Sequence, residues 1–111
     1  MREHWSKRQR RRAYQRKTTL MVCRTCWRHR PALPLAVRIT RIAPRRLDPD
    51  NVPGATKAIV DGLCDWLEVD DGDERLTWVH DQQIGGRGEY GVLLELFEGS
   101  ACEVAIVEAT L

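Results

Sequence analysis

The sequence predicts a single α+β domain in which a small mixed or antiparallel sheet packs with two helices. Two long stretches have helical character, and several shorter ones alternate apolar and polar residues between turn-forming residues. The chain has 111 residues, 42% of them hydrophobic, which suits one modest core. We therefore expect residues 1–111 to form one domain.

The first element is a basic N-terminal helix within residues 1–30. No Pro or Gly interrupts residues 4–30, and Ala13, Leu20 and Trp27 recur at intervals of seven. Pro31 and Pro34 follow, and proline removes a backbone donor and disfavours helical geometry in the preceding residue. The helix is expected to end at about Arg30.

A strand and a structured loop follow the helix. Residues 35–40 alternate in the period of a half-buried strand, which Pro44 closes. Residues 45–54 contain Pro49, Pro53 and Gly54 among charged residues, a composition typical of a structured turn.

The remaining chain predicts a second helix and the rest of the sheet. Residues 55–68 carry one apolar helical stripe, and residues 69–73 form an acidic turn. Two strands are expected at 76–84 and 90–97, paired as an antiparallel hairpin around the glycine-rich residues 85–88. The tail predicts a short edge strand near 104–107.

Charge is divided sharply along the chain. Residues 1–46 hold fifteen of the eighteen Lys and Arg residues and one acid, whereas residues 47–111 hold fifteen acids and three bases. A basic segment of this kind binds polyanions by releasing counterions. The residues expected to contact DNA are Lys7, Arg8, Arg10, Arg11, Arg12, Arg16, Lys17, Arg45 and Arg46.

The acidic residues suggest a divalent cation. Asp48 and Asp50 stand two residues apart on the proline-stiffened loop, and Asp70 and Asp71 follow the second helix. Carboxylates near DNA repel it unless a cation lies between them, and Mg²⁺ favours oxygen ligands. Asp48, Asp50 and Asp71, with Asp70 as the alternative to Asp71, are therefore candidate Mg²⁺ ligands for phosphodiester hydrolysis. Lys57 could offset the charge that develops in the transition state.

Other metal sites fit less well. An EF-hand needs a glutamate twelve residues after the first aspartate, but Ile59 and Gln82 occupy these positions after Asp48 and Asp71. Cys23, Cys26 and His29 resemble a zinc-binding string, but they lack a second ligand pair, and packed thiols are the competing explanation.

Three segments together resemble the RusA-type Holliday-junction resolvases. They are Asp48-Pro-Asp-Asn51, Lys57-Ala-Ile-Val-Asp61-Gly-Leu and Val69-Asp-Asp71, and the similarity spans about residues 36–97. The arginine-rich start is similar to the N-terminal helix of that family.

The resemblance implies a homodimeric endonuclease that uses Mg²⁺ to nick four-way DNA junctions symmetrically. Asp48, Asp50 and Asp71 match the metal-binding aspartates, Lys57 the catalytic lysine, and Asn51 and Asp61 supporting positions.

A second interpretation involves no catalysis. The basic helix would bind nucleic acid, and the aspartates would only cap helices and turns. The sequence shows neither an apolar stretch long enough for a transmembrane helix nor a secretory signal, so we expect a cytoplasmic protein without a membrane partner.

Overall fold

The computed structural model describes residues 2–27, 29–98 and 101–107, and for residues 2–5 and 101–107 it describes the backbone alone. The elements along the chain are α1 (Arg2–Cys26), β1 (Leu35–Ala43), the 3-10 turn η1 (Pro49–Asn51), α2 (Val52–Ala55), α3 (Lys57–Leu67), β2 (Leu76–Ile84), β3 (Gly91–Glu98) and β4 (Ala101–Val107). The expected α+β class is confirmed. The short α2 occupies part of the predicted loop.

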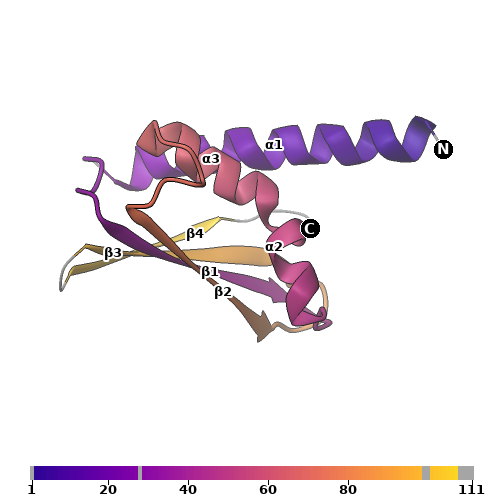
Figure 1. Ribbon diagram of the computed structural model, residues 1–111. Coiled ribbons are helices and arrows are strands. Elements are labelled where there is room, and N and C mark those ends of the chain that lie inside the picture. Colours follow the sequence, from indigo (N-terminus) through magenta and orange to yellow (C-terminus); the bar gives the residue numbers. More distant parts are fainter. Residues whose placement is uncertain (1, 28, 99–100, 108–111) are drawn as a thin grey trace.

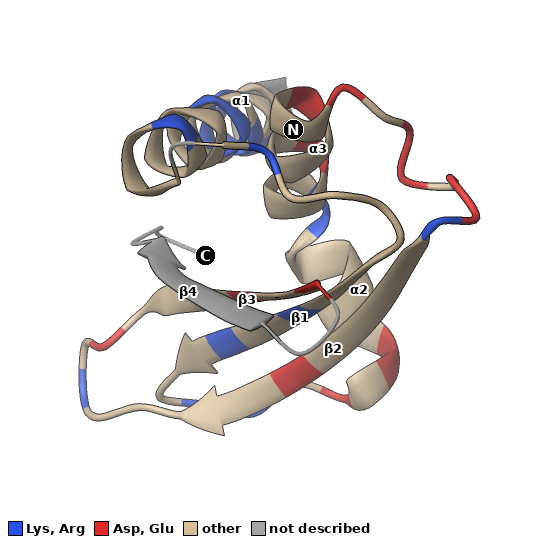
Figure 2. Ribbon diagram, turned by 90° about the vertical axis from the view of Figure 1, so that its left-hand side faces the viewer, with Lys and Arg blue, Asp and Glu red and all other residues tan. Residues whose placement is uncertain are grey.

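The four strands form one mixed sheet in the order β2-β1-β3-β4. β1 pairs parallel with β2 and antiparallel with β3, and β4 lies at the edge beside β3. α1 and α3 lie over the same face of the sheet (Figure 2). The predicted edge strand is present and begins three residues earlier, although its side chains are outside the described part of the structure.

The predicted hairpin between β2 and β3 is wrong. Both strands exist, but β1 lies between them, so their glycine-rich connection crosses the end of β1. There, the Gly85 amide donates to the Ala43 carbonyl at 2.9 Å. The physical reason is burial: β1 places Leu35, Val37 and Ile39 in the core and therefore takes the central position, where both of its edges are paired.

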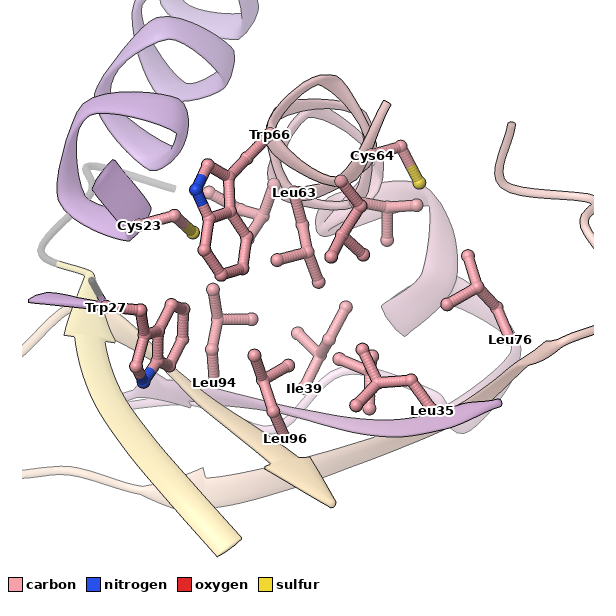
Figure 3. Packing of buried hydrophobic residues seen from close by; sticks show 14 of the residues in the cluster. Cys23, Trp27, Leu35, Ile39, Leu63, Cys64, Trp66, Leu76, Leu94 and Leu96 are labelled. Atoms are coloured by element: carbon pink, nitrogen blue, oxygen red, sulfur yellow. The ribbon is translucent and has the colours of Figure 1, made fainter. Parts of the chain in front are cut away.

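α1 ends at Cys26, four residues before the predicted end. The Trp27 amide still donates to the Cys23 carbonyl, but the Trp27 side chain turns into the core and stacks on Trp66, with ring centroids 5.2 Å apart. Figure 3 shows this pair at the end of the core near Cys23. Tertiary packing of one indole thus ends the helix before proline does.

The core lies between α3, the end of α1 and one face of the sheet. Leu63 of α3 points toward Ile39 of β1 and Leu94 of β3 (Figure 3), and Ile59 of α3 is fully buried in the same cluster. Alternation along the strands and a four-residue spacing on the helix bring these side chains to one layer. The predicted helical stripe of residues 55–68 is therefore confirmed as a core face.

α1 packs very closely on α3 at Gly62. A Cβ added to Gly62 would meet the Arg16 carbonyl oxygen and lie 2.7 Å from the Thr19 Cβ. Beside this contact, the Arg16 guanidinium donates two hydrogen bonds to Asp65, at 2.6 and 2.8 Å. The glycine permits the approach, and the ion pair fixes the orientation of the basic helix on the domain.

The part of α1 that precedes these contacts projects beyond α3 and the sheet, as Figure 1 shows. Its side chains from Lys7 to Tyr14 are exposed. None of the helices found among the described residues combines the length and the apolar character that a membrane span requires.

Candidate nucleic-acid interface and metal-ligating residues

The turn that carries Asp48 and Asp50 follows β1 and is anchored to the end of β2. The Leu47 amide donates to the Gln82 side chain, and the Gln82 side chain donates back to the Leu47 carbonyl, both at 2.8 Å. The Asn51 amide then donates to the Asp48 carbonyl at 2.9 Å, which closes the turn. The backbone of the predicted acidic loop is therefore held on both sides.

The carboxylates on this turn face solvent. Asp48, Asp50 and Asn51 are exposed, and the Asp48 side chain does not cap the turn. Within the described residues, neither aspartate takes part in an ion pair. Two carboxylates two residues apart on a proline-containing turn are thus available to a cation.

An arginine-lined pocket of about 340 Å³ adjoins this turn. Arg8, Arg11 and Arg12 of α1 line it together with Arg41 of β1. Leu47, directly before Asp48, and Gly54, three residues after Asn51, also line it. We call this the arginine pocket; it places four guanidinium groups next to the Asp48–Asn51 turn.

The second acidic segment folds back along α3 before β2 begins (Figure 1). The Lys57 ammonium, at the start of α3, lies 2.6 Å from an Asp71 carboxylate oxygen and 2.9 Å from one of Asp61. The indole N–H of Trp78 donates to the Asp71 carbonyl at 3.0 Å. Three of the residues predicted from the sequence, Lys57, Asp61 and Asp71, are therefore brought together.

The two acidic segments lie at different places on β2. The Asp48 turn is anchored at Gln82 and the Asp71 turn at Trp78, four residues away along the strand, which corresponds to about 13 Å. Because β1 and β2 are parallel, one segment leaves the end of β1 while the other enters the start of β2 (Figure 1). Across the described chain, no three His, Cys, Asp or Glu side chains form a group that could hold a metal ion.

The predicted DNA-binding residues have different surroundings. Arg8, Arg11 and Arg12 line the arginine pocket, whereas Arg16 is engaged by Asp65. Arg10 and Arg12 line a further groove along α1. Lys7, Lys17, Arg45 and Arg46 are exposed.

Arg41 was not predicted as a site residue. It follows Leu35, Val37 and Ile39 at the next inward position of β1, where the alternation would place an apolar side chain. The sequence did carry a signal for this residue: an arginine interrupts the apolar inward positions at the end of a strand, shortly before Arg45 and Arg46.

The two cysteines of the zinc-like string, Cys23 and Cys26, lie in different environments. Cys23 is fully buried in the core, where desolvation raises the pKa of its thiol to about 12, whereas Cys26 is exposed. A thiol with such a raised pKa stays protonated and is a poor metal ligand. The geometry favours the competing explanation, that Cys23 is a packed thiol.

Together these features define an α+β domain with a basic projecting helix, an arginine pocket, and two carboxylates beside it that form no ion pair with any residue the structure describes. No family model, curated protein or solved structure matched the chain.

The ion pair with Lys57 predicts how Asp71 titrates. A side-chain hydrogen bond from Lys57 lowers the pKa of Asp71 below its ordinary value. The favourable interaction is therefore complete above the ordinary carboxyl pKa and is lost as the pH falls through the lowered one. In Lys57→Met, we expect the pKa of Asp71 to rise toward the ordinary value, measured by NMR titration of the side-chain carboxyl carbon.

Asp73 is the internal reference for this titration. Hydrogen bonds from the Arg75 side chain, and then from its backbone amide, lower the pKa of Asp73 to about 2, and Lys57 takes no part in them. Its titration should be the same in both proteins. An Asp71 midpoint that does not move in Lys57→Met would contradict the ion pair.

Proposed function

We propose that this protein is a Mg²⁺-dependent, structure-selective endodeoxyribonuclease that resolves four-way DNA junctions in recombination and repair. The observation that supports it most is the position of the arginine pocket directly beside the Asp48–Asn51 turn. A polyanion held by the arginines would bring its backbone next to two unpaired carboxylates. The resemblance to RusA-type resolvases supports the same activity.

Asp48 and Asp50 fit the requirements of Mg²⁺. This ion takes oxygen ligands, keeps several waters and commonly binds only one or two protein carboxylates. Bound Mg²⁺ polarises a phosphate oxygen and acidifies a water molecule. In this proposal the turn presents its two side chains outward, and the Leu47 to Gln82 hydrogen bonds keep them in place.

The arginines supply the DNA contact. Arg8, Arg11 and Arg12 would neutralise backbone phosphates, which draws DNA to the protein without regard to sequence. The exposed Lys7, Arg10, Arg45 and Arg46, which neighbour the pocket residues in the sequence, would add to this basic surface. The affinity should therefore fall steeply with salt.

Lys57, Asp61 and Asp71 form a separate ion-paired unit within one chain. The resemblance gives Lys57 and Asp71 catalytic roles, and these remain part of the proposal. The two symmetric cuts that resolve a junction require two active sites, so we propose that a homodimer provides one turn from each copy.

Binding without cleavage is the competing function. The division of the aspartates between two places on β2 favours it, because three acids do not converge within the described chain. The two functions make different predictions for Mg²⁺ dependence.

The deciding experiment incubates the protein with a four-way junction labelled on each strand in turn, with Mg²⁺ or with EDTA. We expect paired nicks on two opposing strands in Mg²⁺ alone, mapped on a sequencing gel. A linear duplex and a single strand of the same sequences serve as control substrates. Binding to the junction without a Mg²⁺-dependent product would reject the nuclease and leave the binding protein.

A further inference from the structure

Arg41 is an unusual residue for its position. The inward side chains before it on β1, Leu35, Val37 and Ile39, are fully or almost fully buried and apolar, and Arg41 itself is half-buried. A guanidinium cannot lose its charge, so its burial is costly unless acceptors replace the lost water. The groups that accept hydrogen bonds from Arg41 therefore indicate whether this side chain serves the fold or binds a ligand.

Within the described chain, the acceptors of Arg41 are incomplete. One terminal nitrogen donates to the Arg45 carbonyl at 2.9 Å, which fixes the direction of the side chain. Its Nε is buried and has no hydrogen-bond partner. The guanidinium is therefore held in one direction while its hydrogen-bonding capacity is only partly used, and the pocket that Arg41 lines is open to an acceptor from outside.

Several arginines outside the pocket have carboxylate partners. Arg16 pairs with Asp65, Arg38 with Glu95 and Arg75 with Asp73, each through two hydrogen bonds. Among the described residues that line the arginine pocket, no Asp or Glu is present. Four arginines therefore line a pocket to whose wall the described residues contribute no carboxylate.

The shape of the pocket limits what can enter. Its volume of about 340 Å³ accommodates one phosphoryl group with its flanking atoms and some water, but not a duplex. It lies between α1, which continues past the globule, and the segment from Leu47 to Ala58 that contains α2 (Figure 1). A nucleic-acid strand could follow the projecting helix and place one phosphate in the pocket.

We propose that the arginine pocket binds one phosphoryl group of a DNA strand, with Arg41 as the specific contact and Arg8, Arg11 and Arg12 as further lining residues. The planar guanidinium of Arg41, held in direction by its bond to the Arg45 carbonyl, would present its other terminal nitrogen to a phosphate oxygen, which a lysine could not reproduce. This inference rests on the proposed function for the identity of the ligand as DNA. The affinity of the pocket for phosphate does not depend on cleavage.

The first test follows the arginine side-chain Nε–H signals by ¹⁵N NMR while inorganic phosphate is added to the full chain. We expect a saturable shift of the Arg41 signal with phosphate and none with the same concentration of chloride. Arg41→Lys should lower the phosphate affinity at least tenfold. Arg87→Gln is the control: it removes a whole positive charge from an exposed loop outside the pocket. It should leave the phosphate affinity unchanged.

Arg11→Gln makes the test independent of the Arg41 to Arg45 contact, because Arg11 is an exposed wall residue. It should weaken phosphate binding severalfold without changing the melting temperature. If phosphate leaves the Arg41 signal unmoved, or if Arg87→Gln weakens binding as much as Arg41→Lys, the pocket is not a phosphate site. A positive cleavage assay together with that result would reject this inference alone.

A second titration, with short oligonucleotides, distinguishes an internal phosphodiester from a terminal phosphate as the group that the pocket binds. A 5′-phosphorylated and a 5′-hydroxyl oligonucleotide of the same sequence should bind equally if the pocket holds an internal phosphodiester, as we propose. A preference of tenfold or more for the phosphorylated end would instead assign the pocket to a terminal phosphate and overturn the internal contact.

Discussion

Asp50→Asn is expected to abolish Mg²⁺-dependent cleavage of a four-way junction while leaving junction binding intact or tighter. Asp50 is exposed and unpaired among the described residues, so the change removes a potential ligand without disturbing a contact. Loss of one electrostatic stabiliser commonly lowers catalysis by about 10²-fold or more. Binding should tighten because a negative charge near the DNA backbone is removed.

The measurement combines single-turnover cleavage with a gel-shift titration at the same salt concentration. Glu74→Gln is the matched control, since it neutralises an exposed acid close to the second acidic turn rather than at Asp50. It should cut at the wild-type rate. Cleavage by Asp50→Asn within about threefold of wild type would remove Asp50 from the metal site.

Gly62→Ala is expected to destabilise the domain by about 3 kcal/mol, at the upper end for one added carbon, because the new Cβ meets backbone rather than a flexible side chain. The Arg16 carbonyl lies in its way, so α1 must move away from α3 or α3 must distort. Urea denaturation followed by circular dichroism measures the loss directly.

Gly54→Ala is the matched comparison. Nothing lies within 4 Å of a Cβ added at Gly54, and Gly54 belongs to the helical turn α2. This variant should be neutral or up to about 1 kcal/mol more stable than wild type, because alanine restricts the unfolded chain and favours helix. Equal losses in the two variants would show that the close approach of α1 and α3 is not present in solution.

Gly62→Ala is also expected to affect DNA binding, through the position of α1. The Gly62 approach and the Arg16–Asp65 ion pair are among the contacts that hold α1 at its angle to the domain, and the arginine pocket depends on that angle. A variant that remains folded but displaces α1 should therefore bind DNA more weakly.

Local patterns determined most of the secondary structure. The apolar stripe of residues 55–68 and the alternation in residues 76–84 correspond to α3 and β2, because amphipathic periodicity arises from the geometry of one element against one core. The charge division also required only the sequence, and three of the arginines that it singled out, Arg8, Arg11 and Arg12, line the arginine pocket.

Long-range packing decided the rest. No local sequence signal indicates that β1 lies between β2 and β3. The glycine-rich connection of residues 85–90 is as compatible with a hairpin as with a connection that crosses the end of β1. Trp27 ended α1 early because it reached a partner, Trp66, that lies 39 positions later in the chain.

The candidate site is divided in the same way between sequence and tertiary structure. The sequence by itself determined which side chains are candidates for the proposed chemistry: the aspartates at 48, 50 and 71, Lys57, and the arginines of the first helix. The tertiary structure alone decided that Asp71 meets Lys57 and Asp61, that Asp48 and Asp50 stay apart from them, and that Arg41 completes a pocket with α1. The physical reason is that residue type fixes charge and ligand preference, whereas distance between remote side chains depends on strand order and helix packing.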